Sequence, residues 1–222
     1  MRSIPFALYF GLLSSFLFLS SCSDSDEDET GGSATLEVQT AEDIPADADA
    51  VSGPPGQGPP PNYTFYSLTD GKIVDKADSN STRWDIALAG TTILVNGGTS
   101  GPGQGEAQVV TGAFDDLTEA PESGYETDSE AGRAIPTGSN NGWYNYTSTT
   151  TKPNNTVIPL PGRIIVLRTA EGNYAKIEVL SYYKGNPTID ADFTPVGGRH
   201  YTFQYVVQPN GSRTFGNATA GQ

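Results

Sequence analysis

Short alternations of apolar and polar residues, separated by turn sequences, dominate the chain after residue 60. Three pairs of such segments flank glycine-containing turns: Tyr63–Leu68 and Lys72–Lys76 around Asp70-Gly71, Ile164–Arg168 and Tyr174–Tyr183 around Glu171-Gly172-Asn173, and His200–Gln208 and Ser212–Phe215 around Asn210-Gly211. Asp-Gly and Asn-Gly favour hairpin turns because both turn residues tolerate positive φ. Few windows place apolar residues at the three-four spacing of a helix. The pattern therefore predicts an all-β fold of antiparallel sheets built from hairpins.

The alternation also predicts which side chains point into the core. Within residues 175–179 the alanine, isoleucine and valine share one face, so Lys176 and Glu178 are expected to meet water or to pair. The aromatic residues of 201–205 share a face, which places His200 on the opposite one. Ile164–Leu167 lacks alternation, and this predicts a strand that is covered on both faces.

The first 21 residues have the pattern of a signal peptide. Arg2 precedes an apolar run from Ile4 to Leu19, and the run ends at Leu19-Ser-Ser-Cys22. This ending resembles the bacterial lipobox, in which cleavage occurs before the cysteine and a lipid is joined to its sulfur. Cys22 is the only cysteine of the chain, so we expect it to be the lipidated residue that anchors the protein to a membrane. The alternative is an ordinary secretory signal with a chance cysteine.

Acidic residues concentrate directly after Cys22. The chain has a formal net charge of −14, and residues 22–51 contain ten carboxylates and no lysine or arginine. Residues 22–32 are therefore predicted to be a solvated, self-repelling tether. The stretch also resembles the acidic export signal of surface lipoproteins in the Bacteroidetes, which would place the domain on the cell exterior. Because no basic stripe is present, nucleic acid is not an expected partner.

The remaining chain is long enough for one domain. Thr35–Val38 alternates like a short strand, so the domain is predicted to span residues 33–216, with a tail at 217–222. Residues 51–61 contain mostly proline and glycine and are predicted to form an exposed loop. Residues 147–161, rich in Thr, Asn and Pro, are predicted to be a flexible connection.

Two further features of the sequence are assigned structural roles. Asn96–Gly105 contains six glycines or prolines but lacks the Gly-Lys-Ser/Thr of a phosphate loop, so it is interpreted as a structural loop with several positive-φ positions. Asp85, next to Trp84 in a predicted strand, is expected to be a buried acceptor for backbone amides. A catalytic triad or a zinc site lacks its parts, because the chain has one histidine, His200, and one cysteine. We therefore do not expect an enzyme.

Several segments together resemble one known family. They are RWDIALAGTTILVNGGTSGPGQG at 83–105, FDDL at 114–117, GWYNY at 142–146, GRIIVLRTAEGNYAKIEVLSYYKGNP at 162–187 and RHYTFQYVVQPNGSRTF at 199–215. They resemble the HmuY family of Bacteroidetes haem-binding lipoproteins. The resemblance implies an all-β domain, a lipid anchor in the outer membrane, and capture of haem for delivery to a TonB-dependent receptor. It also implies that two side chains hold the iron, histidines in the founding member and sometimes methionine in relatives.

This ligand pair cannot be carried over to the chain. After cleavage at Cys22 the protein has one histidine, His200, and no methionine. His200 could be a single axial ligand, or an ordinary surface histidine. Tyr144 or Tyr146 could bind ferric haem as phenolate, with Trp143 stacking on the porphyrin; alternatively these residues form an ordinary strand. A third possibility is an apolar cleft that accepts the porphyrin without coordinating its metal.

Three functions follow from these alternatives. The first is a binder of haem or a related porphyrin at the cell surface that works with a TonB-dependent receptor. The second is a relative that has lost haem ligation and binds another ligand or a receptor protein. The third is a structural surface lipoprotein.

Overall fold

The computed structural model describes residues 36–49, 59–216 and 219–220, which belong to the compact unit Ser33–Gln222. The predicted signal peptide, Cys22, the tether and most of the 51–61 loop lie outside the described residues. Among the described residues no helix is long and apolar enough to cross a membrane.

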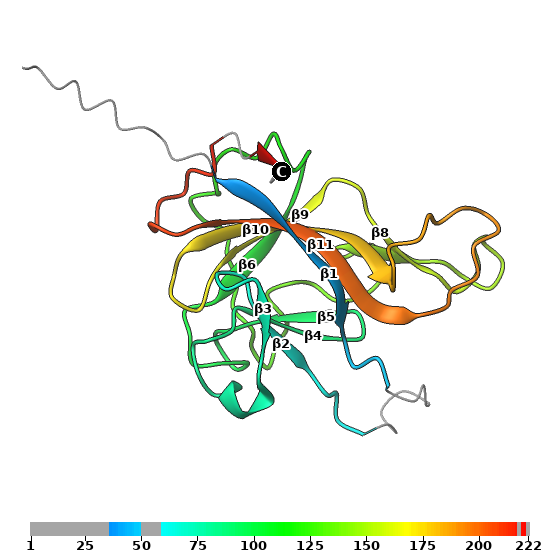
Figure 1. The fold of residues 1–222 in the computed structure, drawn as a ribbon, viewed down its shortest axis with the longest axis horizontal. Helices are drawn as coiled ribbons and strands as arrows, with labels where there is room; N and C mark the ends of the chain where they lie inside the picture. The colour runs from blue at the N-terminus through cyan, green and yellow to red at the C-terminus, as the bar shows by residue number, and fades with distance from the viewer. Residues whose placement is uncertain (1–35, 50–58, 217–218, 221–222) are drawn as a thin grey trace, which may run out of the picture. The chain divides into compact units, whose positions relative to one another are not determined.

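Two sheets and a separate hairpin form the domain (Figure 1). The larger sheet has the order β12-β1-β11-β10-β9-β6, with β1 Glu37–Pro45, β6 Glu106–Thr111, β9 Arg163–Arg168, β10 Tyr174–Tyr183, β11 Gly198–Gln208 and β12 Thr219–Ala220. The smaller sheet has the order β3-β2-β4-β5, with β2 Thr64–Ser67, β3 Lys72–Val74, β4 Ile86–Ala89 and β5 Thr92–Val95. The hairpin consists of β7 Tyr144–Tyr146 and β8 Val157–Pro159, and a 3₁₀ turn covers Lys76–Asp78.

The strand pairs are antiparallel, except for the two-residue β12, which runs parallel to β1. The predicted all-β antiparallel fold is therefore confirmed. β12 lies within the segment 217–222 for which a tail was expected, and it adds a strand to the edge of the larger sheet.

The main core lies between the two sheets, because side chains of both sheets belong to one buried cluster. Period-2 alternation explains how each strand contributes: Ile165 and Leu167 point into this cluster, whereas Ile164 and Val166 enter a second cluster on the outer face of the larger sheet. The prediction that 164–167 is covered on both faces is thus confirmed. Each such side chain contributes roughly 1.5–3 kcal/mol on burial.

Two of the three predicted hairpins are confirmed. β2 pairs with β3 and β9 pairs with β10 across the expected turns. The third prediction is wrong, because the arm after Asn210-Gly211 does not pair with β11. Instead, the Ala120 amide donates to the Arg213 carbonyl oxygen and the Phe215 amide donates to the Thr118 carbonyl oxygen, both at 2.8 Å.

Lys176 also differs from its prediction. Its side chain is on the face opposite Ile177, as the alternation requires, but it is only 1% exposed. Its Nζ donates to the carbonyl oxygens of Phe114 at 2.6 Å and Leu117 at 3.1 Å. The alternation predicts that Lys176 meets water or pairs with another side chain, whereas the 114–117 segment covers it and binds its ammonium through backbone carbonyl oxygens.

The 147–161 segment is not simply a flexible connection, because it contains β8 and folds back on β7. The Thr147 hydroxyl is buried and donates to the Pro153 carbonyl oxygen at 2.5 Å. In the other direction, the Thr156 amide donates to the Thr147 hydroxyl at 2.8 Å. These hydrogen bonds hold the loop between β7 and β8 in one conformation.

Candidate functional site

Trp143 lies in an aromatic cluster inside the main core. It is 1% exposed, and its ring centroid is 4.8 Å from that of Tyr144 and 5.1 Å from that of Tyr201. The indole Nε1 donates to the Thr91 carbonyl oxygen at 3.2 Å. In this arrangement the indole faces protein side chains that position β7 against the larger sheet.

Tyr144 and Tyr146 are separated although they lie in the same short strand. Tyr144 is buried, and its hydroxyl accepts a hydrogen bond from the Thr91 Oγ1 at 3.2 Å. Tyr146 is 48% exposed, and its hydroxyl donates to Asn155 Oδ1 over 3.4 Å. The structure thus brings Trp143 and Tyr144 together in the core and leaves Tyr146 at the surface, beside the β7–β8 loop.

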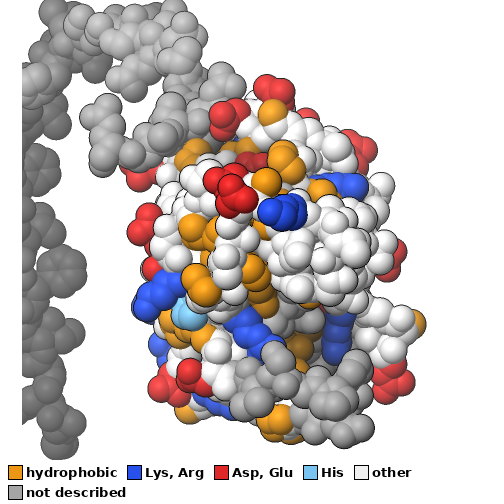
Figure 2. Space-filling model, turned by 90° about the vertical axis from the view of Figure 1, so that its right-hand side faces the viewer, with side chains coloured by type: hydrophobic (Ala, Val, Ile, Leu, Met, Phe, Trp, Pro, Cys, Tyr) orange, Lys and Arg blue, Asp and Glu red, His pale blue; other side chains and the backbone are white. Residues whose placement is uncertain are grey.

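A cleft of about 370 Å³ opens between the β7–β8 loop and the β10–β11 loop. We call it the loop cleft; it is lined by Lys152, Asn154 and Asn155 from the first loop and by residues 191–195 from the second. Both loops lie on the right in Figure 1, and Figure 2 views this side of the domain. An ion pair joins the two loops, with Lys152 Nζ 3.8 Å from Asp192 Oδ1.

Phe193 is the aromatic residue of the loop cleft. Its ring meets the Tyr183 ring edge-on, with centroids 5.0 Å apart and planes at 70°. The Tyr183 hydroxyl in turn accepts a hydrogen bond from the Val157 amide at 2.9 Å, so the phenol joins β10 to β8. Tyr183 lies in β10 and is bonded to β8, so it is held in place and gives Phe193 a fixed packing partner.

His200 is half-buried in β11, and its ring contacts two backbone carbonyl oxygens. Its Nδ1 lies 3.0 Å from the Gly198 carbonyl oxygen and 3.2 Å from that of Gly197. Carbonyl oxygens only accept, so these contacts favour the neutral tautomer with the proton on Nδ1 and the lone pair on Nε2. This is the arrangement that orients a histidine ligand toward a metal. Figure 2 shows the histidine at the surface among hydrophobic and basic side chains.

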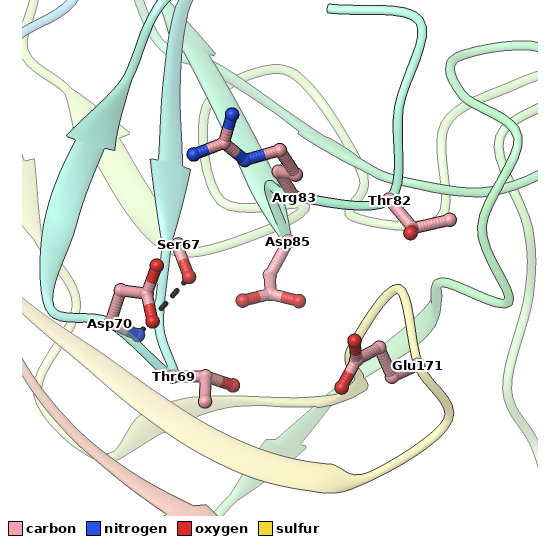
Figure 3. Close-up of a pocket in the computed structure, with 7 residues that line it drawn as sticks. All are labelled: Ser67, Thr69, Asp70, Thr82, Arg83, Asp85 and Glu171. Atoms are coloured by element: carbon pink, nitrogen blue, oxygen red, sulfur yellow. Dashed lines mark hydrogen bonds between the residues drawn. The ribbon is translucent and has the colours of Figure 1, made fainter. Parts of the chain in front are cut away.

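A second, smaller pocket lies at the β2–β3 turn and surrounds Asp85 (Figure 3). Asp85 is 4% exposed; its Oδ2 accepts from the Leu68 amide at 2.7 Å and its Oδ1 from the Ala170 amide at 3.0 Å. Burial raises the pKa of the Asp85 carboxyl, and these amides oppose that effect. The predicted role of Asp85 as a buried acceptor is confirmed. It joins the β2–β3 hairpin to the β9–β10 turn.

The segment Asn96–Gly105, which we call the glycine loop, is a structural loop, but positive φ is not the main reason for its glycines. Within 97–105 only Gly98 has positive φ, at 58°. At Gly97 a Cβ atom would lie 2.0 Å from the Gly105 carbonyl oxygen, so close backbone approach is what requires glycine. The Asn96 side chain closes the loop, since its Nδ2 donates to the Trp84 carbonyl oxygen at 2.7 Å and its Oδ1 accepts from the Gly103 amide at 3.0 Å.

The parts of the chain that the structure describes contain no cluster of three or more His, Cys, Asp or Glu side chains suited to a metal ion. A haem iron needs only one or two axial ligands, so this finding does not bear on the single-ligand alternatives. The sequence did not identify the loop cleft, because its walls come from loops about 40 residues apart. The isolated Phe193 in a polar, proline-containing loop was the one local signal.

A sequence model of one family, described as "HmuY protein", matches residues 60–194 of this chain. No curated protein matches. Among solved structures, the apo HmuY analog of Tannerella forsythia has 15% identity and a TM-score of 0.44, and the match covers 79% of this chain and 96% of that one.

Two other structures are similarly distant. A Bacteroides fragilis protein described as a lipoprotein has 16% identity and a TM-score of 0.41, covering 65% of this chain and 83% of that one. A Bacteroides vulgatus protein described as an HmuY-like heme-binding protein has 13% identity and a TM-score of 0.40, covering 78% and 91%. The family assignment therefore rests on the sequence match, which includes more than half of the chain.

Proposed function

The chain belongs to the HmuY family, and from this premise we propose that it is a lipid-anchored outer-membrane protein, facing the cell exterior, that binds haem or a related porphyrin. It passes this ligand to a TonB-dependent receptor. The observation that carries the proposal is the family match over 60–194, which includes both walls of the loop cleft as far as residue 194.

Two side chains that line the loop cleft support a porphyrin as its ligand. Haem is a flat apolar ring with two carboxylates, so its site needs an apolar surface and a cation at the rim. Phe193 supplies the aromatic surface, and Lys152 supplies a cation whose present partner, Asp192, is 3.8 Å away and exposed. An exposed ion pair of this kind contributes little, about 0–1 kcal/mol, so a propionate can replace Asp192 at low cost.

We assign the axial position on the iron to one of two side chains, Tyr146 or His200. The Tyr146 hydroxyl bonds to Asn155, a residue of the cleft wall, through a contact of 3.4 Å that is long for an O–H donor. His200 follows the cleft residue Pro195 by five positions in the chain, and its Nδ1, not its Nε2, contacts backbone carbonyl oxygens. When haem is bound, either residue would supply an axial bond. Trp143 and Tyr144 would position β7 from within the core.

The test is a haemin titration of residues 23–222 followed by absorption in the Soret region. Wild type should shift and sharpen the band. Tyr146→Phe or His200→Ala, whichever removes the ligand, should abolish the shift, while Phe193→Ala should weaken binding without removing coordination. Tyr174→Phe, on β10 and away from the cleft, is the matched control. An unchanged wild-type spectrum together with no calorimetric heat would rule out haem binding.

The absent His/Met pair favours a second candidate, in which the family member has lost haem ligation and binds another ligand or the receptor protein itself. This candidate predicts no Soret change, but a TonB-dependent receptor should be crosslinked to the lipoprotein on intact cells. The membrane localisation is tested separately: Cys22→Ser should abolish acylation and release the protein from the membrane.

A further inference from the structure

A third pocket, of about 530 Å³, lies on the outer face of the smaller sheet and shares no lining residue with the loop cleft. We call it the arginine pocket; the side chains that matter are Tyr63, Leu94, Thr99, Ser100, Ser129 and Arg133. Leu94 of β5 belongs to the cluster on this outer face, and Tyr63 packs against the same cluster. The pocket therefore has an apolar floor with a phenol ring beside it.

Arg133 is the cation of this pocket. It is exposed, and its Nη1 donates to the Ser100 Oγ at 3.3 Å. Among the described residues no carboxylate lies within 4.0 Å of its guanidinium, although Glu130 lines the same pocket. In a protein of net charge −14, a guanidinium held by a neutral hydroxyl remains available to an anionic ligand.

The guanidinium and the phenol line the same pocket, so one ligand can contact both. Burial raises the pKa of the Tyr63 phenol; the charge of Arg133 lowers it and that of Asp128 raises it. An anion bound to Arg133 would thus carry its remaining atoms over Tyr63 and Leu94. The fork of the guanidinium matches a planar carboxylate through two parallel hydrogen bonds.

Three hydroxyl groups also line the pocket, beside Glu130 and residues 131–132. Thr99 and Ser100 come from the glycine loop, and Ser129 comes from the facing turn, where its Oγ donates to the Gly132 carbonyl oxygen at 3.2 Å. A hydroxyl can donate and accept, so a row of them suits a ligand that itself carries several hydroxyls. The aromatic ring suits the apolar face of a pyranose, and the volume is within the usual range of small-molecule sites.

We propose that the arginine pocket binds an acidic monosaccharide unit, a pyranose with a carboxylate that Arg133 holds while the sugar ring lies on Tyr63. Uronic acids and sialic acids share this chemistry. The proposal is independent of the porphyrin site, because the two pockets have no lining residue in common.

The experiment is calorimetric titration of the full-length lipoprotein in detergent micelles, with glucuronic acid and N-acetylneuraminic acid as probes. At least one should bind, and glucose, the neutral counterpart of glucuronic acid, should not. Comparing the two acids identifies the source of the carboxylate. Arg133→Gln should weaken binding roughly tenfold or more, with Arg133→Lys in between, because a lysine keeps the charge but not the fork.

Arg163→Gln is the matched control, since Arg163 is an arginine outside this pocket, and it should bind as wild type does. Binding of haemin should be the same in Arg133→Gln and wild type, which separates this proposal from the porphyrin site. Three results would overturn it: no heat with either acid, equal affinity for glucose, or equal affinity for acetate or inorganic phosphate, which would indicate an unspecific anion site.

Discussion

At the scale of single residues, Lys176 is the clearest case of a side chain whose environment the local pattern could not predict. Burial lowers the pKa of its ammonium, and the charge of Asp115 opposes this. Two carbonyl oxygens and the Phe114 ring, whose centroid is 4.3 Å from Nζ, surround the group. The compensation comes from charge-assisted hydrogen bonds and a cation–π contact.

Replacing Lys176 should therefore destabilise the domain although no carboxylate partner is lost. Lys176→Met keeps most of the stem but leaves the carbonyls of Phe114 and Leu117 without a donor, which costs about 1–3 kcal/mol for each buried group left unsatisfied. Lys176→Ala adds a cavity and should cost more than Lys176→Met. Urea unfolding gives both values.

The control for this pair is Lys184→Ala, an exposed lysine whose loss should change the unfolding free energy by no more than about 0.5 kcal/mol. If Lys176→Met unfolds at the same urea concentration as wild type, water replaces the ammonium at both carbonyl oxygens. The two hydrogen bonds of Lys176 would then not stabilise the domain.

At the scale of elements, the turn sequences predicted where the chain reverses direction. They did not always predict which strand or segment pairs with the residues that follow the turn. Asn210-Gly211 does form a turn, with Gly211 at φ 75°. The arm that follows leaves β11 and pairs with residues 118–120, which lets Phe215 enter the outer cluster with Phe114 and Val206. Burial of an aromatic side chain decides the partner, and this depends on segments about 100 residues apart.

The glycine loop offers a sharp test at this scale. Gly97→Ala places a methyl group 2.0 Å from the Gly105 carbonyl oxygen, so the loop must move and Asn96 must give up bonds. We expect destabilisation of more than about 1 kcal/mol, as for other overpacked sites. Thermal unfolding followed by circular dichroism measures it.

Gly112→Ala is the matched control, because nothing lies within 4 Å of its added Cβ and its φ is not positive. It should be neutral, or stabilising by roughly 0.4–1 kcal/mol through the unfolded chain. Equal melting temperatures for the two variants would contradict the close approach of the loop strands.

At the scale of the whole molecule, tyrosines make up a large part of the core, and this gives the domain a defined alkaline limit. Burial raises the pKa of Tyr182 and of Tyr125 to about 12, and it also raises the pKa of Tyr201 and of Tyr205. Between pH 10 and 12 the unfolded chain loses phenolic protons that the folded chain keeps. Stability is therefore fully present below pH 10 and is lost as the pH rises toward the folded pKa values.

Tyr182, which is buried, should contribute a decrease of at most about 1.4 kcal/mol per pH unit in this window, and the partly exposed Tyr125 less. Tyr182→Phe removes one of them, and the variant should show a shallower decline of the urea midpoint from pH 10 to 11.5. Between pH 7 and 9 the pH dependence of the two proteins should be parallel, which serves as the internal control. A wild-type midpoint that stays constant to pH 11.5 would refute the assignment.

For the candidate site, as for the fold, local sequence predicted some features and tertiary packing decided the others. GWYNY at 142–146 marked Trp143, Tyr144 and Tyr146 as a group, but the alternating pattern could not say that only Tyr146 would remain at the surface. That outcome depends on Tyr201 and Thr91, which close the core around the other two. The loop cleft itself has walls from two loops that no local rule connects.

The sequence by itself determined most of the longer strand segments, two of the hairpins and the inward faces of β10 and β11, because these depend on period-2 alternation and turn chemistry. Residue counts show one histidine, His200, and one methionine, Met1, which lies in the predicted signal peptide. Only the tertiary structure decided that Lys176 is buried, that 212–215 pairs with 118–120, and which pockets open between loops. These features arise where segments distant along the chain compete to cover the same apolar surface, and that competition has no signature in any single window of sequence.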